Sequence, residues 1–174
     1  GYARSHGIGN NDAHPVTSPL PAELHEEAWV ADRTIAALER HRQQQRDQPF
    51  LMWASFSKPH PPYDPPRPYD GLYDPRELPP PMGDWDDEEL VHDRDPELVQ
   101  RRAIYGWERL SPQAVQVIRA RYAGLVTYQD AMVGRLLDWL AEAGLTEDTI
   151  VVYTSDHGDL LGDFGRFFKR CMLD

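Results

Sequence analysis

The stretch TIVVYTSDHGDLLGDFGRFFK, residues 149–169, decides how the fold of this chain is predicted. Residues 150–153 form an unbroken apolar run rich in β-branched side chains, which is typical of a strand buried on both faces of a parallel sheet. Asp156 and His157 follow that run, at the end of a strand where ligands bind in open α/β sheets. Three cations come next: Arg166, Lys169 and Arg170. This pattern suits a divalent cation plus an oxyanion, and the alternative is a solvated strand end followed by ordinary surface cations.

A helical pattern leads into a second apolar run earlier in the chain. Between residues 22 and 44, apolar side chains recur at spacings of three and four, as in one stripe of a helix: Leu24, Ala28, Ala31, Ile35 and Leu38. Residues 50–56, FLMWASF, then indicate another buried strand. His60 and Lys58 follow it in a proline-rich loop, so we expect His60 at the same sheet edge as the carboxylate–imidazole pair.

A long helix is predicted before the last strand. Ser111 suits the N-cap, Pro112 the first helical position and Gly144 the C-terminal stop. Tyr128 and Asp130 interrupt the apolar stripe between them, so a short polar contact is expected there. The order helix, turn, strand therefore occurs twice, which predicts an α/β fold with a mostly parallel sheet flanked by helices.

Residues 62–110 form an irregular, proline-rich excursion between these two units. Loops of this length are uncommon in compact domains unless they are functional or disordered. The aromatic side chains argue against plain disorder: Tyr63, Tyr69, Tyr73 and Trp85. We expect the excursion to pack near the ligand edge of the sheet, where it could line a substrate cleft. The acidic run at 84–89 is interpreted as a solvated turn, with a calcium site as the alternative, although the EF-hand spacing is absent.

The composition excludes several classes of protein. The chain has 174 residues and a formal net charge of −11, which argues against a nucleic-acid binder because phosphate contacts need a basic face. The single cysteine, Cys171, allows no internal disulfide, and no apolar run approaches the roughly 18 residues of a membrane span. Three histidines fit no metal template and are expected to be solvated: His6, His14 and His25. The chain begins at Gly1 and ends in mid-pattern, so we expect a piece of a longer protein; compartment and oligomeric state stay open.

Four stretches of this sequence resemble bacterial sulfatases of the alkaline-phosphatase-like superfamily. They are SPLPAELHEEAWVADRTI, PFLMWASFSKPHPPYDPP, YAGLVTYQDAMVGRLLDWLAEAGLTEDTIVVYTSDHG and DLLGDFGRFFK, and they occur in the family's order. The resemblance implies that residues 1–174 are part of one sulfatase catalytic domain, incomplete at both ends. It also implies a three-layer sandwich, with a mostly parallel sheet between layers of helices.

The resemblance assigns roles to four residues. Asp156 and His157 match the family's metal ligands at the end of the strand. Calcium is the preferred metal. Oxygen ligands alone would favour calcium or magnesium, and the imidazole widens the choice to manganese or zinc. His60 matches the histidine that contacts the sulfate ester or protonates the leaving oxygen. Lys169 matches the lysine that binds the sulfate. The implied function is a metal-dependent hydrolase of sulfate esters.

The family's nucleophile is a cysteine converted to formylglycine within a C-x-P-x-R or similar motif. Cys171 lies in KRCMLD, which does not match that motif, so the formylglycine is expected in a segment before residue 1. This chain alone is therefore expected to be inactive and to bind divalent metal weakly, because two protein ligands do not hold a hard cation tightly. The alternatives are a phosphonate monoester or phosphodiester hydrolase of the same superfamily, and a non-catalytic α/β binding module. The expected substrate is a small-molecule or glycan sulfate ester.

Overall fold

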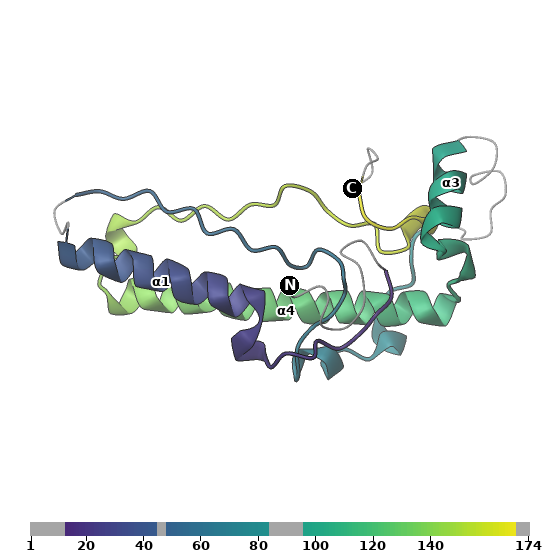
Figure 1. The fold of residues 1–174 in the computed structure, drawn as a ribbon, viewed down its shortest axis with the longest axis horizontal. Helices are drawn as coiled ribbons and strands as arrows, with labels where there is room; N and C mark the ends of the chain where they lie inside the picture. The colour runs from purple at the N-terminus through teal and green to yellow at the C-terminus, as the bar shows by residue number, and fades with distance from the viewer. Residues whose placement is uncertain (1–12, 45–47, 84–95, 170–174) are drawn as a thin grey trace.

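The computed structural model describes residues 13–44, 48–83 and 96–169. Two long helices, α1 (Glu26–Gln44) and α4 (Pro112–Glu142), lie side by side along the molecule, and α3 (Pro96–Tyr105) stands near one end of α4 (Figure 1). Short 3-10 turns occupy Ala22–Leu24, Tyr69–Gly71, Pro75–Glu77, Trp107–Arg109, Thr146–Asp148 and Asp163–Gly165. Within these ranges, no helix is both long and apolar enough to cross a membrane.

Helix α4 begins and ends at the predicted signals. The Ser111 hydroxyl accepts a hydrogen bond from the Ala114 N–H at 3.2 Å, which satisfies one of the free donors of the first turn. Pro112 occupies the first turn, where its missing N–H costs nothing. Gly144 adopts a left-handed conformation with φ 70° just after the helix, which a residue without Cβ does readily. The prediction of this helix is confirmed.

The stripe of α1 packs against the middle of α4. Ala28 and Ala31 are buried against Tyr128 and Met132, in one cluster of apolar side chains. The Tyr128 hydroxyl donates a hydrogen bond to the carbonyl of Ala22 at 2.5 Å, and burial raises its pKa well above the usual value. The expected polar contact in the α4 stripe is therefore present, and it ties the start of α1 to α4.

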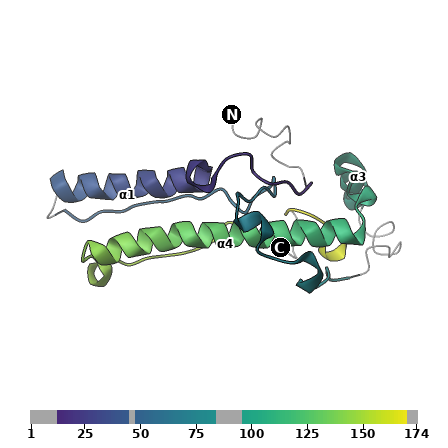
Figure 2. The ribbon, with the colours of Figure 1, turned by 90° about the horizontal axis from the view of Figure 1, so that it is seen from below.

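The predicted parallel sheet, and with it the three-layer sandwich, is wrong for the described residues. The two apolar runs are extended, and each runs back along the helix that precedes it (Figures 1 and 2), but neither forms a strand in the described ranges. The side chains of Leu51 and Ile150 are 94% and 93% exposed, although both runs were expected to be buried on two faces. An apolar run becomes a strand only where a neighbouring backbone satisfies its N–H and C=O groups.

The excursion at 62–110 packs against the rest of the molecule and includes a helix. Its first residues, 62–66, are buried, and it contains α3, a helix that the sequence did not predict. A second apolar cluster joins this region to α4 and to the last turn of the chain, and includes Tyr63, Trp107, Ile118, Leu125 and Phe167. Aromatic burial at both ends of the excursion therefore fixes it to the body of the molecule.

Candidate active site

The loop that carries His60 is held by buried charges. Lys58 is 4% exposed, and its ammonium donates hydrogen bonds to Asp64 Oδ1 at 2.7 Å and to the Pro62 carbonyl at 2.9 Å. Asp64 is fully buried. The ion pair closes residues 58–64 into a compact turn, with His60 half-buried at its bend. A buried pair of this kind is expensive to break, so the turn is held in one geometry.

Glu27 anchors the same loop to α1. One carboxylate oxygen accepts hydrogen bonds from the backbone N–H groups of Ser57 (3.0 Å) and Lys58 (2.8 Å), and the other accepts from His25 Nδ1 at 3.0 Å. Burial alone raises the pKa of Glu27, but these hydrogen bonds outweigh it and the net pKa is lowered. His25 is fully buried, so the prediction that it is solvated is wrong.

His157 and Asp156 lie together at the end of the second extended segment. Asp156 Oδ1 accepts the backbone N–H of His157 at 3.0 Å, and its Oδ2 lies 3.4 Å from His157 Nε2. His157 Nδ1 lies 2.8 Å from the Gly158 carbonyl, and because a carbonyl only accepts, this nitrogen carries the proton. Nε2 is then the ring nitrogen without a proton, and it lies on the side of the Asp156 carboxylate.

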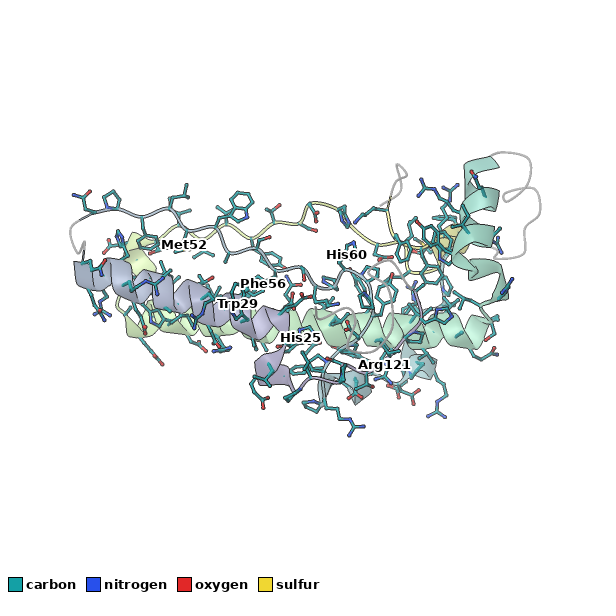
Figure 3. All side chains as sticks on the ribbon, in the orientation of Figure 1. His25, Trp29, Met52, Phe56, His60 and Arg121 are labelled. Carbon is teal, nitrogen blue, oxygen red and sulfur yellow. The ribbon has the colours of Figure 1, made fainter. Side chains whose placement is uncertain are left out.

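The structure brings His60 and His157 together from the two separate units. Their ring centroids are 6.4 Å apart, with the rings inclined at 67°. His60 lies where the first extended segment ends, on the side of the second one (Figure 3). His60 Nδ1 is also 2.8 Å from a carbonyl, that of Pro61, so its Nε2 is the nitrogen available to a substrate.

Asp159 is a residue of this site that the sequence reading missed. Its Oδ2 accepts the Tyr63 hydroxyl at 2.7 Å, and its Oδ1 accepts the backbone N–H groups of Leu161 (3.0 Å) and Phe168 (2.9 Å). Burial raises the pKa of Asp159 above its usual value, while these hydrogen bonds and nearby His60 act in the opposite direction. Burial and the Asp159 charge also raise the pKa of Tyr63, which therefore remains a donor. The available signal was its place directly after Asp-His-Gly.

Lys169 follows a strained turn. Leu161, Phe164 and Phe168 have φ of 48°, 54° and 67°, in the left-handed region that side chains with a Cβ rarely adopt. Holding a residue in this conformation lowers stability by about 1–3 kcal/mol. Such conformations occur where the surrounding contacts fix them, often at functional sites. Lys169 is half-buried directly after Phe168, and no described contact joins its ammonium to the histidines.

The donors at this site fit part of a metal centre. Asp156 Oδ2 and His157 Nε2 lie 3.4 Å apart, a spacing that two ligands of one divalent cation can take. Among the residues the structure describes, no third histidine, cysteine or carboxylate completes a cluster that could hold a metal ion. The pair could therefore supply two ligands, and any others would have to come from elsewhere.

The other sequence predictions have mixed outcomes. Tyr69 packs against Tyr128 with ring centroids 4.9 Å apart, and the Tyr73 hydroxyl lies 2.7 Å from Thr127 Oγ1, so both tyrosines contact α4. Several predicted features lie outside the described residues: Trp85, the acidic run at 84–89, Arg170 and Cys171.

The chain is similar to a known protein family and to solved structures. The sulfatase family model matches residues 5–170. The chain is 35% identical over 147 residues to an arylsulfatase of Clostridium perfringens, covering 84% of this chain and 29% of that protein. It is 31% identical to a choline-sulfatase of Rhizobium meliloti, covering 83% and 28%. The solved structure of a phosphonate monoester hydrolase from Silicibacter pomeroyi superposes with a TM-score of 0.76 at 30% identity, covering 98% of this chain and 34% of the other.

These matches define the class of protein: a member of the alkaline-phosphatase-like superfamily. The chain belongs to the sulfatase family, as the resemblance in its four stretches predicted. It spans about a third of the length of these relatives.

Proposed function

We propose that the full protein containing this chain hydrolyses sulfate esters. The observation that carries the proposal is the approach of His60 to His157, from loops almost a hundred residues apart, to a ring separation of 6.4 Å. Groups that act on one substrate must lie within hydrogen-bond distance of it or one water away. Two relatives that are themselves named sulfatases add support.

Each of the four residues has a role in this proposal. Asp156 and His157 would hold a divalent cation, calcium first and manganese, magnesium or zinc as alternatives, which when bound supplies Lewis-acid polarisation of the sulfuryl oxygens. Lys169 would neutralise charge on the same oxygens. His60, in its doubly protonated imidazolium form, would donate the Nε2 proton to the departing alcohol oxygen and become neutral, while its Nδ1 proton stays bonded to the Pro61 carbonyl.

Hydrolysis of a phosphonate monoester is the second candidate. The specific support is the likeness to the Silicibacter pomeroyi hydrolase, together with an Asp–His pair that accommodates softer cations than an all-oxygen site. Phosphonate and sulfate esters both place charge on oxygens around a tetrahedral centre. The same histidine and lysine could therefore serve either reaction.

Turnover of two aryl esters by the full-length protein separates these candidates. We expect 4-nitrophenyl sulfate to be hydrolysed faster than an aryl phosphonate, with loss of activity in EDTA and recovery on adding calcium or manganese. His60→Gln should lower kcat by about 10²–10⁴-fold, the usual contribution of a general acid. His14→Gln, at an exposed histidine, is the matched control and should leave kcat unchanged. Preference for the phosphonate would favour the second candidate, and turnover of neither ester would reject both.

The metal-binding expectation has its own test. Calorimetry on residues 1–174 should show only weak binding of calcium or manganese, because the described residues offer two adjacent donors. Submicromolar binding would contradict the prediction that these residues bind divalent metal only weakly.

A further inference from the structure

We propose that Asp159 is a positioning residue that sets where Lys169 stands relative to His60 and His157. The inference rests on the proposed function, because it concerns the placement of the groups assigned to that reaction. Asp159 lies two residues after His157, and its carboxylate bonds to groups from both of the other segments of the site. One side chain therefore joins three stretches of sequence.

The first link reaches the loop of His60. Asp159 Oδ2 accepts the hydroxyl of Tyr63 at 2.7 Å, and Tyr63 is fully buried three residues after His60. The Tyr63 ring packs edge-on against Tyr122 of α4, with centroids 6.1 Å apart. Because the ring is fixed in the core, its hydroxyl holds the carboxylate at a defined distance from the His60 loop.

The second link reaches the backbone before Lys169. Asp159 Oδ1 accepts the N–H of Phe168 at 2.9 Å, and the Phe168 carbonyl accepts the N–H of Leu160 at 3.0 Å. The N–H and the C=O of Phe168 are therefore bonded to Asp159 and Leu160, which lie two and three residues after His157. Phe168 is left-handed, with φ 67°, and its conformation decides the direction in which the chain enters Lys169.

Asp159 accepts hydrogen bonds from the N–H groups of two of the three left-handed residues in this turn that carry a Cβ, Leu161 and Phe168. Without the carboxylate, these donors would lose their acceptor and Phe168 could relax towards the right-handed region. That rotation would change the direction in which the chain enters Lys169. Asp159 therefore acts on the reaction through the backbone, without touching the substrate.

Asp163 offers a matched control in the same turn. Its Oδ1 accepts the N–H of Met82 at 2.9 Å and the Arg119 guanidinium at 3.1 Å, which fastens the turn to residue 82 and to α4 without a bond to Phe168. Removing that carboxylate should destabilise the turn without altering the conformation of Phe168. Asp159→Asn is the conservative variant, because its amide oxygen can still accept both backbone N–H groups and the Tyr63 hydroxyl can reorient.

A double-mutant cycle in the full-length protein, with 4-nitrophenyl sulfate as the probe, tests the inference. We expect Asp159→Ala and Lys169→Ala each to lower kcat by about 10²–10³-fold, the usual loss of one charge-stabilising group. The double variant should be about as slow as Lys169→Ala alone, because residues that act as a unit are not additive. Asp159→Asn should recover most of kcat, and Asp163→Ala should lower Tm but leave kcat within about threefold of wild type.

Losses that multiply in the double variant would overturn the inference, as would an Asp163→Ala enzyme as slow as Asp159→Ala. Hydrogen exchange over residues 160–169 gives a readout that does not need activity. Asp159→Ala should lose protection there while the α4 amides keep theirs, and unchanged protection would also overturn the inference. If wild type hydrolyses neither a sulfate nor a phosphonate ester, the proposed function fails, yet hydrogen exchange still decides whether Asp159 holds the turn.

Discussion

Replacing Glu27 by alanine removes the carboxylate that fastens the His60 loop to α1. The carboxylate is fully buried and accepts four hydrogen bonds, from the N–H groups of Ser57 and Lys58, from the His25 ring and, at 3.3 Å, from the Ser57 hydroxyl. Ser57 is exposed, so water can replace its acceptor. Lys58 and His25 are buried, and a buried donor left unsatisfied costs about 1–3 kcal/mol, which gives a loss of about 2–6 kcal/mol in the free energy of unfolding.

Urea unfolding of the full-length protein at pH 7 measures this loss, and hydrogen exchange at residues 50–60 localises it. Glu26→Ala is the matched control: its carboxylate also accepts from Ser57, at 2.7 Å, but the side chain is 39% exposed. An exposed contact of that kind contributes about 0–1 kcal/mol. Equal losses in the two variants, or a Glu27→Ala loss below about 1 kcal/mol, would refute the assignment of Glu27 as the anchor.

The sign of the pH dependence follows from the lowered pKa of Glu27. Its carboxylate is ionised in the folded protein at pH values where the unfolded chain, with the usual pKa near 4.5, already binds a proton. The contribution of its charge is therefore complete above pH 4.5 and is lost as the pH falls through the lower, folded pKa. The groups that face this carboxylate are His25 and Lys58. The stability difference between wild type and Glu27→Gln should shrink from pH 5 to pH 3, and a constant difference would contradict the argument.

Two further substitutions test the packing around the site. Lys58→Met removes the ammonium partner of buried Asp64 and should cost about 3–5 kcal/mol, whereas adding Asp64→Leu should recover much of it. Urea unfolding checks this, and a double variant no better than Lys58→Met would argue against the ion pair. Gly124→Ala places a Cβ 2.3 Å from the Tyr69 carbonyl oxygen and should cost about 1–3 kcal/mol. Gly134→Ala, in open space on the same helix, should instead stabilise by about 0.5–1 kcal/mol, and thermal unfolding that ranks the two alike would contradict the packing.

The two long helices, α1 and α4, were predictable because their signals are local. The Ser111 cap, the proline after it and the Gly144 stop each act within one turn, and the apolar stripe repeats every three or four residues. The sheet was not predictable in the same way. The runs around Leu51 and Ile150 have strand composition, but strand formation depends on a partner backbone, and the described residues provide none for either run.

The residues of the site were likewise predictable only where their signals are local. His60, Asp156 and His157 could be nominated from sequence because each follows an apolar run directly, and polar residues at such ends are recognisable. Asp159 and Glu27 could not, because their partners are 96 and 31 residues away: the Tyr63 hydroxyl and the Lys58 N–H.

The chain has 29 acidic residues, and the sequence alone does not show which of their carboxylates are buried and which are on the surface. What distinguishes Asp159 is that its two oxygens accept bonds from both remaining segments of the site, a property of the fold and not of any local pattern. Residues that contact a substrate can therefore be nominated from motifs, whereas the residues that hold them in place emerge only from tertiary hydrogen bonds. If Asp159→Ala keeps full activity while Lys169→Ala loses it, this division of roles is wrong for the present site.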